Sequence, residues 1–380
     1  MTRISFVSVY PPLRGRLSEY AYSLIDELQK CPGINRLDII TEMVGHPNSE
    51  RLNDKTTVYR IWESNKPFSL LRIPIKIMKL RPDIVHFNVH MAVFGQSRLA
   101  NFTGLCLPFI CRLLGFRTIV TLHNMIEKIE IKNTGYQDAF INRLGAFLVT
   151  KLISMTSAVT LTMQSHTDFF KQKYRCKNAK TIPHGTWKHD SWREDTFRSS
   201  GTILYMGHSG PYKDLMLLLD AVRILEKKRS DVRLIVAGTS HPNYPGFLEK
   251  YKSKTSPKNV RFIGYVPDDE LQPIFEGADV VVLPYFTCTG TSGVAHLASS
   301  FGTPIVATDL PEFRELAREG CGLLITPHAA EALANRVDEI MSNPNLALKL
   351  KEQNQYFSHT RTWDKIASSF CELYDELLVR

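Results

Sequence analysis

The sequence predicts an α/β fold with two doubly wound, Rossmann-like domains that face each other across a cleft. Three observations lead to this prediction. The chain has 380 residues, which is more than one ordinary hydrophobic core accommodates. Apolar, β-rich runs alternate with helical patterns along the whole chain. The β-rich runs are nearly continuous in apolar residues, which is typical of parallel strands covered by helices on both faces.

Both halves of the chain begin with a strand and a polar turn, and each turn leads into a helical pattern, over residues 18–30 and 214–228. The β-rich runs of the first half predict six strands, at residues 3–9, 36–41, 56–61, 83–87, 117–123 and 157–162. Those of the second half predict six more, at residues 202–207, 232–238, 260–264, 279–284, 303–308 and 322–326.

The predicted hinge is a polar segment without periodicity, residues 181–201, which contains Pro183 and Gly185. We therefore expect an N-terminal domain over residues 1–183 and a C-terminal domain over residues 184–363.

The composition is that of a globular protein, with 43% hydrophobic and 22% charged residues. No segment is long and apolar enough to predict a membrane span, and the apolar run near the N-terminus is too short for a signal peptide. The seven cysteines are scattered and include no CxxC pair. They indicate neither a disulfide framework nor a zinc site, so we expect a cytoplasmic protein.

The net charge of +9 is unevenly distributed. Residues 66–180 contain 17 Lys or Arg and 5 Asp or Glu, whereas residues 181–380 contain 22 and 25. Residues 67–83 and 101–117 mix bulky apolar side chains with Arg and Lys. The preferred interpretation is a set of buried helices with a solvated basic rim. The alternative is peripheral contact with an anionic membrane, on its cytoplasmic face. Nucleic acid fits less well, because no recognised binding module is visible.

Ligands of open α/β sheets bind beyond the carboxyl ends of the strands, so the turns after strands are the candidate site. The turn after the first strand contains Gly15, which allows close backbone approach, and Ser18, which could cap the following helix. A plain turn and a phosphate contact are equally compatible with this segment. It lacks the GxGxxG fingerprint, which argues against an NAD-dependent dehydrogenase.

Two turns of the second half suggest an anion site. Gly207 ends a predicted strand, and Lys213 follows six residues later. The segment TCTGTSGVAHLASSFGTP, residues 287–304, begins a predicted helix with small residues and ends it at Gly302. Backbone amides at a helix start lack internal partners and carry the positive end of the helix dipole, so a diphosphate could bind there. The competing interpretations are a surface lysine and an ordinary capped loop. The residues that supply the helix start are Gly290, Thr291, Ser292 and Gly293.

The order and spacing of several motifs resemble the retaining glycosyltransferases of the GT-B fold, family 4 (group 1). The resemblance runs nearly end to end. The motifs that carry it are YPPLRGRLSEYAYSLIDEL, RPDIVHFNVH, TLHN, TIPHG, LYMGHSGPYKD, VRFIGYVPDDELQPIFEGADVVVLP and FGTPIVATDLPEF.

This resemblance implies an acceptor-side N-terminal domain, a C-terminal domain that binds a nucleotide sugar, and a last helix, at about residues 364–380, that packs back on the first domain. Lys213 would neutralise the diphosphate, and the amides of Thr291 to Gly293 would cradle it. Gly207 and His208 would lie beside the donor. Phe262 and Ile263, in the RFIGYV turn, would hold the base mainly through backbone groups. Gly15 would approach the phosphates, and His123 matches the histidine near the donor sugar.

The implied reaction is transfer of a sugar, most simply a hexose, to a hydroxyl of a glycan, a lipid-linked or a small-molecule acceptor, with retention and without a metal or other cofactor. The leaving diphosphate needs fixed cations and donors, and the reacting groups need positioning. The catalytic candidates are His123 and Lys213.

The sequence also departs from the family. The two acids of its E-x7-E motif are replaced by Thr289 and Leu297, its usual arginine by His208, and one N-terminal glycine by Arg14. A catalytically inactive GT-B-like binding subunit of a glycosylation complex is therefore an alternative. A synthase that acts on a soluble phosphorylated sugar is a second one.

Other polar residues have competing interpretations. His86 and His90 have a metal-ligand spacing, but His86 is expected at a strand end and no helix places the two on one face. His184 and His296 are expected to be structural. Glu312 and Glu315 could meet the sugar or could favour a helix start through its dipole.

Overall fold

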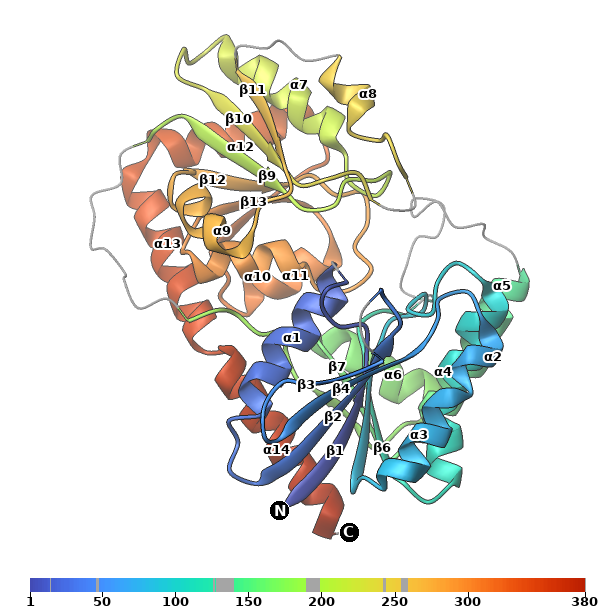
Figure 1. Cartoon of the computed structure of the whole chain (residues 1–380). Coiled ribbons are helices and arrows are strands. Elements are labelled where there is room, and N and C mark those ends of the chain that lie inside the picture. Colours follow the sequence, from blue (N-terminus) through green and yellow to red (C-terminus); the bar gives the residue numbers. More distant parts are fainter. Residues whose placement is uncertain are drawn as a thin grey trace. The chain divides into compact units, whose positions relative to one another are not determined.

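The computed structural model describes residues 1–13, 15–45, 48–125, 127, 140–188, 199–241, 244–253 and 259–379. These residues form two compact units (Figure 1). The first unit contains the described residues up to Gly185 and the C-terminal segment from Trp363 onward, and the second extends from Thr186 to Thr362.

The first unit is built on an eight-stranded sheet with the order β3-β4-β2-β1-β5-β6-β7-β8. Every neighbouring pair is parallel except β3 and β4. Six of its strands, β4-β2-β1-β5-β6-β7, therefore follow the 3-2-1-4-5-6 order of a doubly wound sheet. The strands are β1 (Thr2–Val7), β2 (Ile34–Glu42), β3 (Ser49–Arg51), β4 (Thr56–Trp62), β5 (Ile84–Val89), β6 (Arg117–Leu122), β7 (Ala158–Leu161) and β8 (Ala179–Thr181).

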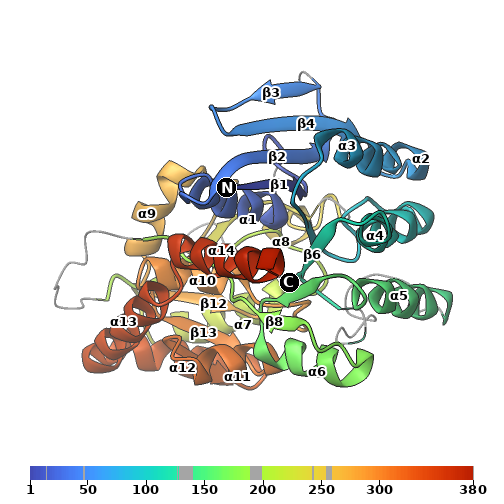
Figure 2. The same cartoon turned by 90° about the horizontal axis from the view of Figure 1, so that it is seen from below.

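Helices cover both faces of this sheet, as the continuous apolar strands require. Two of them, α1 and α14, pack against each other although they come from opposite ends of the chain (Figure 2). The helices are α1 (Arg16–Leu28), α2 (Pro67–Leu70), α3 (Arg72–Leu80), α4 (Arg98–Leu113), α5 (Phe140–Ile153), α6 (Gln164–Tyr174) and α14 (Trp363–Val379).

The first helix begins earlier than the sequence pattern indicated. Gly15, with φ of 132°, is the N-cap of α1, and no side chain caps this end. Ser18 therefore lies inside the helix, and its buried hydroxyl has no hydrogen-bond partner among the described residues. The predicted capping role of Ser18 is wrong, because the glycine makes the turn three residues upstream of the expected cap.

The second unit is built on a six-stranded parallel sheet with the order β11-β10-β9-β12-β13-β14, which is again 3-2-1-4-5-6. The strands are β9 (Thr202–Met206), β10 (Arg233–Ala237), β11 (Val260–Gly264), β12 (Val280–Leu283), β13 (Ile305–Thr308) and β14 (Leu323–Thr326). The helices are α7 (Leu215–Glu226), α8 (Glu249–Lys252), α9 (Asp268–Glu276), α10 (Gly293–Ser300), α11 (Pro311–Arg318), α12 (Ala330–Ser342) and α13 (Pro344–His359).

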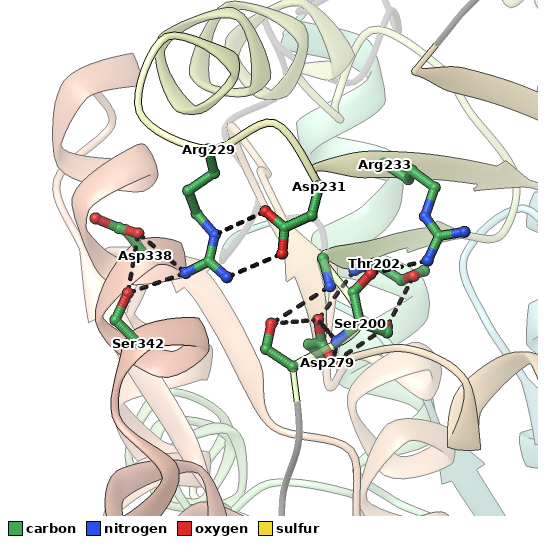
Figure 3. Close-up of polar contacts among 10 residues, drawn as sticks. Ser200, Thr202, Arg229, Asp231, Arg233, Asp279, Asp338 and Ser342 are labelled. Atoms are coloured by element: carbon green, nitrogen blue, oxygen red, sulfur yellow. Dashed lines mark hydrogen bonds and ion pairs between the residues drawn. The ribbon is translucent and has the colours of Figure 1, made fainter.

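A buried carboxylate joins the two central strands of this sheet at their amino ends. Asp279, just before β12, accepts hydrogen bonds from the amides of Ser200 and Thr202 at 3.0 Å each (Figure 3). Nearby, Arg229 is paired with Asp231, which fixes the turn between α7 and β10. These contacts set the position of β9 against β12, and thereby of the loops at the opposite ends of the two strands.

Candidate functional site

The point where the strand order reverses in the second sheet lies between β9 and β12, because the chain continues to β10 on one side and to β13 on the other. Ligands of doubly wound folds bind beyond the carboxyl ends of the strands at this point. Two loops begin there, residues 207–214 after β9 and residues 284–292 after β12. They contain the lysine and the glycine-rich segment predicted from the sequence.

Hydrogen bonds between backbone groups hold these two loops together. The amide of Asp214 donates to the carbonyl of Pro284 at 2.6 Å, and the amide of Phe286 donates to the carbonyl of Tyr212 at 3.0 Å. Lys213 and Tyr285 form an antiparallel bridge between the two loops. The structure therefore brings Lys213 into the same constellation as the loop that leads into α10.

Lys213 is fully buried, which excludes the surface interpretation of this lysine. Its ammonium donates to the carbonyl of Met206 at 3.2 Å. It also lies 4.9 Å from the ring centre of Tyr285 and 5.6 Å from that of Tyr205. Aromatic faces stabilise a cation without neutralising it, so the two rings help to keep a positive charge at the strand ends.

The loop after β9 depends on two glycines. Gly207 follows the strand with φ of 101°, a conformation that side chains disfavour. Gly238, at the end of β10, faces it so closely that a Cβ on Gly238 would overlap the carbonyl oxygen of Gly207. The two loop entrances thus pack backbone against backbone. His208, the next residue, lies 3.3 Å from the hydroxyl of Thr239 through Nδ1.

The start of α10 has the predicted form. Ser292 is the N-cap and accepts a hydrogen bond from the amide of Ala295, and the helix begins at Gly293. Gly302, with φ of 69°, follows its C-terminal end as expected. The amides of the first turn have no acceptor one turn back, and the helix dipole adds partial positive charge. Gly290 and Gly293 have no side chains that could cover these backbone amides.

The hydroxyl of Thr291 lies 2.7 Å from Nε2 of His296, one turn into α10. This contact fixes the loop on the helix and places His296 in a structural role, with its ring stacked on Phe357 of α13. The two residues that replace the acids of the E-x7-E motif have different environments. Thr289 is exposed in the loop, whereas Leu297 is partly buried on α10.

The segment expected to hold the base lies in the strand predicted at residues 260–264. Phe262 and Ile263 lie in β11 at the edge of the sheet and are partly buried. The turn is made by Gly264, which has φ of 72° and accepts a hydrogen bond from the amide of Gly238 at 2.5 Å. Parallel pairing with β10 continues to Gly264, so the strand ends where the sequence predicted.

Helix α11, which packs on Tyr285 of the loop after β12, contains two glutamates of interest. Glu312 and Glu315 are both buried on α11, and Phe313 of the same helix packs on Tyr285 with ring centres 5.5 Å apart. Glu312 lies in the first turn of α11, where the helix dipole favours a carboxylate, whereas Glu315 lies beyond that turn. The sequence left the role of both residues open, and their burial is what the structure adds.

The remaining predicted residues belong to the first unit. Gly15 lies between β1 and α1, and His123 directly follows β6. Nε2 of His123 lies 2.6 Å from Oδ1 of Asn88, and the ring of Tyr20 meets the imidazole edge-on at 4.5 Å. Burial holds the pKa of His123 well below its ordinary value, and neighbouring histidines lower it further.

His86 lies in the middle of β5, not at a strand end as expected, because the strand continues to Val89. Its Nδ1 lies 2.7 Å from the hydroxyl of Tyr374 on α14, and its Nε2 lies 2.7 Å from the hydroxyl of Thr121. Burial lowers the pKa of His86 to about 3. One ring nitrogen thus attaches the last helix to the sheet, and the other links β5 to β6.

His184 is also structural, with its ring 5.3 Å from Tyr20 and 5.4 Å from Trp363. Within the described part of the chain, no group of three or more His, Cys, Asp or Glu residues is arranged to hold a metal ion. In the same residues, none of the helices combines the length and the apolar character needed to cross a bilayer.

Comparison with known proteins shows which proteins the second unit resembles in sequence. Residues 189–356 match the sequence profile of the family described as "Glycosyl transferases group 1". The D-inositol 3-phosphate glycosyltransferase of Corynebacterium glutamicum is 25% identical over 182 residues, which are 46% of this chain and 43% of the relative. The match therefore spans less than half of that relative's length.

Solved structures share the fold of the whole chain. Sucrose-phosphate synthase from Thermosynechococcus elongatus has a TM-score of 0.77 at 17% identity, with all of both chains covered. HepE of Anabaena, solved in complex with UDP-glucose, has a TM-score of 0.72 at 16% identity, with 99% of this chain and 100% of that chain covered. Residues 189–356 are thus similar to the group 1 glycosyl transferases, and the chain shares the two-domain GT-B fold of these solved structures.

Proposed function

We propose that this protein is a retaining glycosyltransferase that moves a sugar, most simply a hexose, from a nucleoside diphosphate sugar to an acceptor hydroxyl on a glycan, a lipid-linked or a small molecule. The observation that carries the proposal is the buried Lys213, held next to the loop that opens α10 at the switch point of the second sheet. A diphosphate is the ligand whose charge and size this arrangement suits best.

Lys213 and the amides of Thr291, Ser292 and Gly293 bind the two phosphates in this proposal. Transfer requires that the nucleoside diphosphate leave with the bonding electron pair, so negative charge grows on its terminal phosphate. A fixed ammonium and preorganised amides stabilise that charge more in the transition state than in the ground state.

His123 acts as a neutral group near the donor sugar in this proposal. Because Nδ2 of Asn88 donates to the hydroxyl of Ser8 at 3.0 Å, the oxygen of the Asn88 amide faces His123. Nε2 of the histidine must then carry the proton, and Nδ1 is left as an acceptor for a sugar hydroxyl. Its low pKa keeps His123 neutral at physiological pH, which is compatible with positioning and not with donation of a proton.

The other donor contacts are assigned as the sequence predicted. Gly207 and His208 lie at the entrance of the loop that contains Lys213, Phe262 and Ile263 present the edge strand to the base, and Gly15 approaches the phosphates. The proposed reaction needs no metal, because Lys213 and the α10 terminus supply the positive charge. Full turnover after treatment with a chelator is the expected result, and a strict requirement for added Mg²⁺ would contradict it.

The alternative of an inactive binding subunit is favoured by one observation, the absence of acids at Thr289 and Leu297. Incubation of the protein with UDP-, GDP- and ADP-sugars separates the two functions. UDP-glucose belongs in this panel because HepE was solved with it. Slow release of free nucleotide supports an enzyme, binding without turnover under any acceptor supports the subunit, and no binding of any nucleotide sugar overturns both.

The lysine is tested by Lys213→Met, which keeps the volume of the stem and removes the charge. Loss of a buried charge partner costs at least about 2 kcal/mol, so we expect the Kd of the preferred nucleotide to rise about 30-fold or more. Lys349→Met, at an exposed position on α13, is the matched control and should leave the Kd unchanged. An unaltered Kd in a folded Lys213→Met protein would refute the assignment.

A further inference from the structure

Four helices of the first unit form one layer in which the exposed surface is apolar and basic. Helices α2, α3, α4 and α5 contact one another in sequence along the sheet (Figures 1 and 2). Together they contain seven Lys or Arg and no Asp or Glu. Surfaces in contact with water alone normally mix both signs of charge, so an all-positive layer indicates an anionic partner.

The helix α5 shows the pattern most clearly. Its buried residues, Ala146, Val149, Thr150 and Ile153, recur at helical spacing on the side that faces the sheet. Its other side exposes a second apolar stripe with the same spacing, Phe140, Leu144, Phe147 and Leu148. Lys151 continues that stripe one turn further on and is exposed. Packing within the unit therefore covers only one of the two apolar sides of α5.

The neighbouring helices continue this surface. Phe68 of α2 is 84% exposed, although Leu70 beside it is fully buried. On α3, Ile75 and Met78 are exposed whereas Ile73 and Ile77 belong to the core. The expectation of buried helices with a solvated basic rim is therefore incomplete, because large apolar side chains lie on the outer side as well.

The helix α4 adds Leu99, Phe102 and Leu113 to the exposed apolar residues, and Leu113 is 69% exposed. In contrast, the described residues of the second unit expose only three large apolar side chains. The apolar surface is thus concentrated on one layer of one unit, which is typical of an interaction site and not of scattered surface hydrophobics.

We propose that the outer side of α2, α3, α4 and α5 docks on an anionic lipid bilayer, with the aromatic and aliphatic side chains in the headgroup region and the Lys and Arg side chains on the lipid phosphates. Long basic side chains can lie along an apolar surface and still reach a charged headgroup. A second copy of this chain fits less well, because a two-fold contact would place the same positive charges against each other. The proposal is independent of the transfer reaction, since it needs neither donor nor acceptor.

The test is co-sedimentation of the full chain, without nucleotide, with phosphatidylcholine vesicles and with vesicles that also contain phosphatidylglycerol. We expect binding to the anionic vesicles only, and a decrease in binding as salt is added. Each basic residue near an anionic surface contributes about fivefold to partition, so Lys79→Glu combined with Arg112→Glu should lower it at least about 25-fold. Lys349→Glu, a single charge reversal on α13 of the second unit, is the control and should bind normally.

The apolar contribution is tested by Phe68→Ser combined with Phe140→Ser, which should lower partition at least about tenfold by removing two buried aromatic rings from the lipid. Tyr356→Ser, at an exposed aromatic on α13 of the second unit, is the matched control. Circular dichroism and nucleotide binding confirm that each variant is folded. Absence of sedimentation with anionic vesicles at low salt overturns the proposal. Equal binding to neutral vesicles also overturns it, as does a dimer that the Phe68 and Phe140 substitutions dissociate.

Discussion

Asn354 on α13 connects the elements that position the start of α10, and its replacement is the sharpest test of the second unit's architecture. The side chain is fully buried. Its amide nitrogen donates to the carbonyls of Thr303 at 2.8 Å and Gly322 at 3.1 Å, and its oxygen accepts from the amide of Gly322 at 2.8 Å. One side chain thus joins the segments that enter β13 and β14.

The expected cost of Asn354→Leu follows from these three bonds to backbone groups. Each buried hydrogen bond contributes about 1 kcal/mol net, and a buried backbone group left without a partner costs a further 1 to 3 kcal/mol, in order of magnitude. The carbonyl of Gly322 keeps a hydrogen bond from the amide of Ile305, so two groups are orphaned, not three. We therefore expect a loss of about 5 to 9 kcal/mol in the free energy of unfolding.

Urea unfolding, followed by far-ultraviolet circular dichroism and by nucleotide binding, measures this loss for the second unit. Asn345→Ala, at an exposed position on the same helix, is the control and should change stability by less than about 0.5 kcal/mol. A loss below about 1 kcal/mol in Asn354→Leu would refute the reasoning, because it would mean that water or a shifted backbone replaces the three bonds.

Two further predictions concern the histidine network and the glycine contact. The pKa of His86 is about 3 in the folded protein, below the ordinary value of 6.5, so the unfolded chain binds the extra proton as the pH falls below 6.5. Stability of the first unit should therefore decrease as the pH falls from 6.5 towards 4, by up to about 1.4 kcal/mol per pH unit, and His86→Gln should flatten the profile; an unchanged slope in the variant would exclude His86 as its source. Gly238→Ala should destabilise the second unit by more than about 2 kcal/mol, because the added Cβ overlaps the carbonyl of Gly207. Gly246 also has a positive φ, but open space surrounds the position of a Cβ, so Gly246→Ala should cost only about 1 kcal/mol. Equal losses of stability in thermal unfolding of the two variants would show that backbone strain, and not steric overlap, explains both.

The fold could be predicted from the sequence because parallel strands buried on both faces leave a strong local pattern. All twelve predicted strands are present, and the two that were missed, β3 and β8, have three residues each. Segments that short bury too little apolar surface to produce a run that can be distinguished from a loop.

The sequence predicted only those parts of the candidate site that depend on backbone conformation and backbone groups. The capped start of α10 and the turn at Gly207 follow from glycine and serine at positions where few other residues suit the geometry. The burial of Lys213 could not be predicted, because it depends on Tyr205 in β9 and on Tyr285 in the loop after β12, which are far apart in the sequence. The exposure of the second apolar stripe of α5 could not be predicted either. An apolar periodicity in the sequence predicts burial, and it does not show which of two apolar faces the fold leaves exposed.

The central claim is that a diphosphate binds between Lys213 and the first amides of α10. A crystal structure of the protein with its preferred nucleotide sugar tests this most directly. We expect phosphate oxygens within about 3 Å of Nζ of Lys213 and of the amide nitrogen of Ser292 or Gly293. A diphosphate bound elsewhere, with the side chain of Lys213 still turned to the carbonyl of Met206, would contradict it.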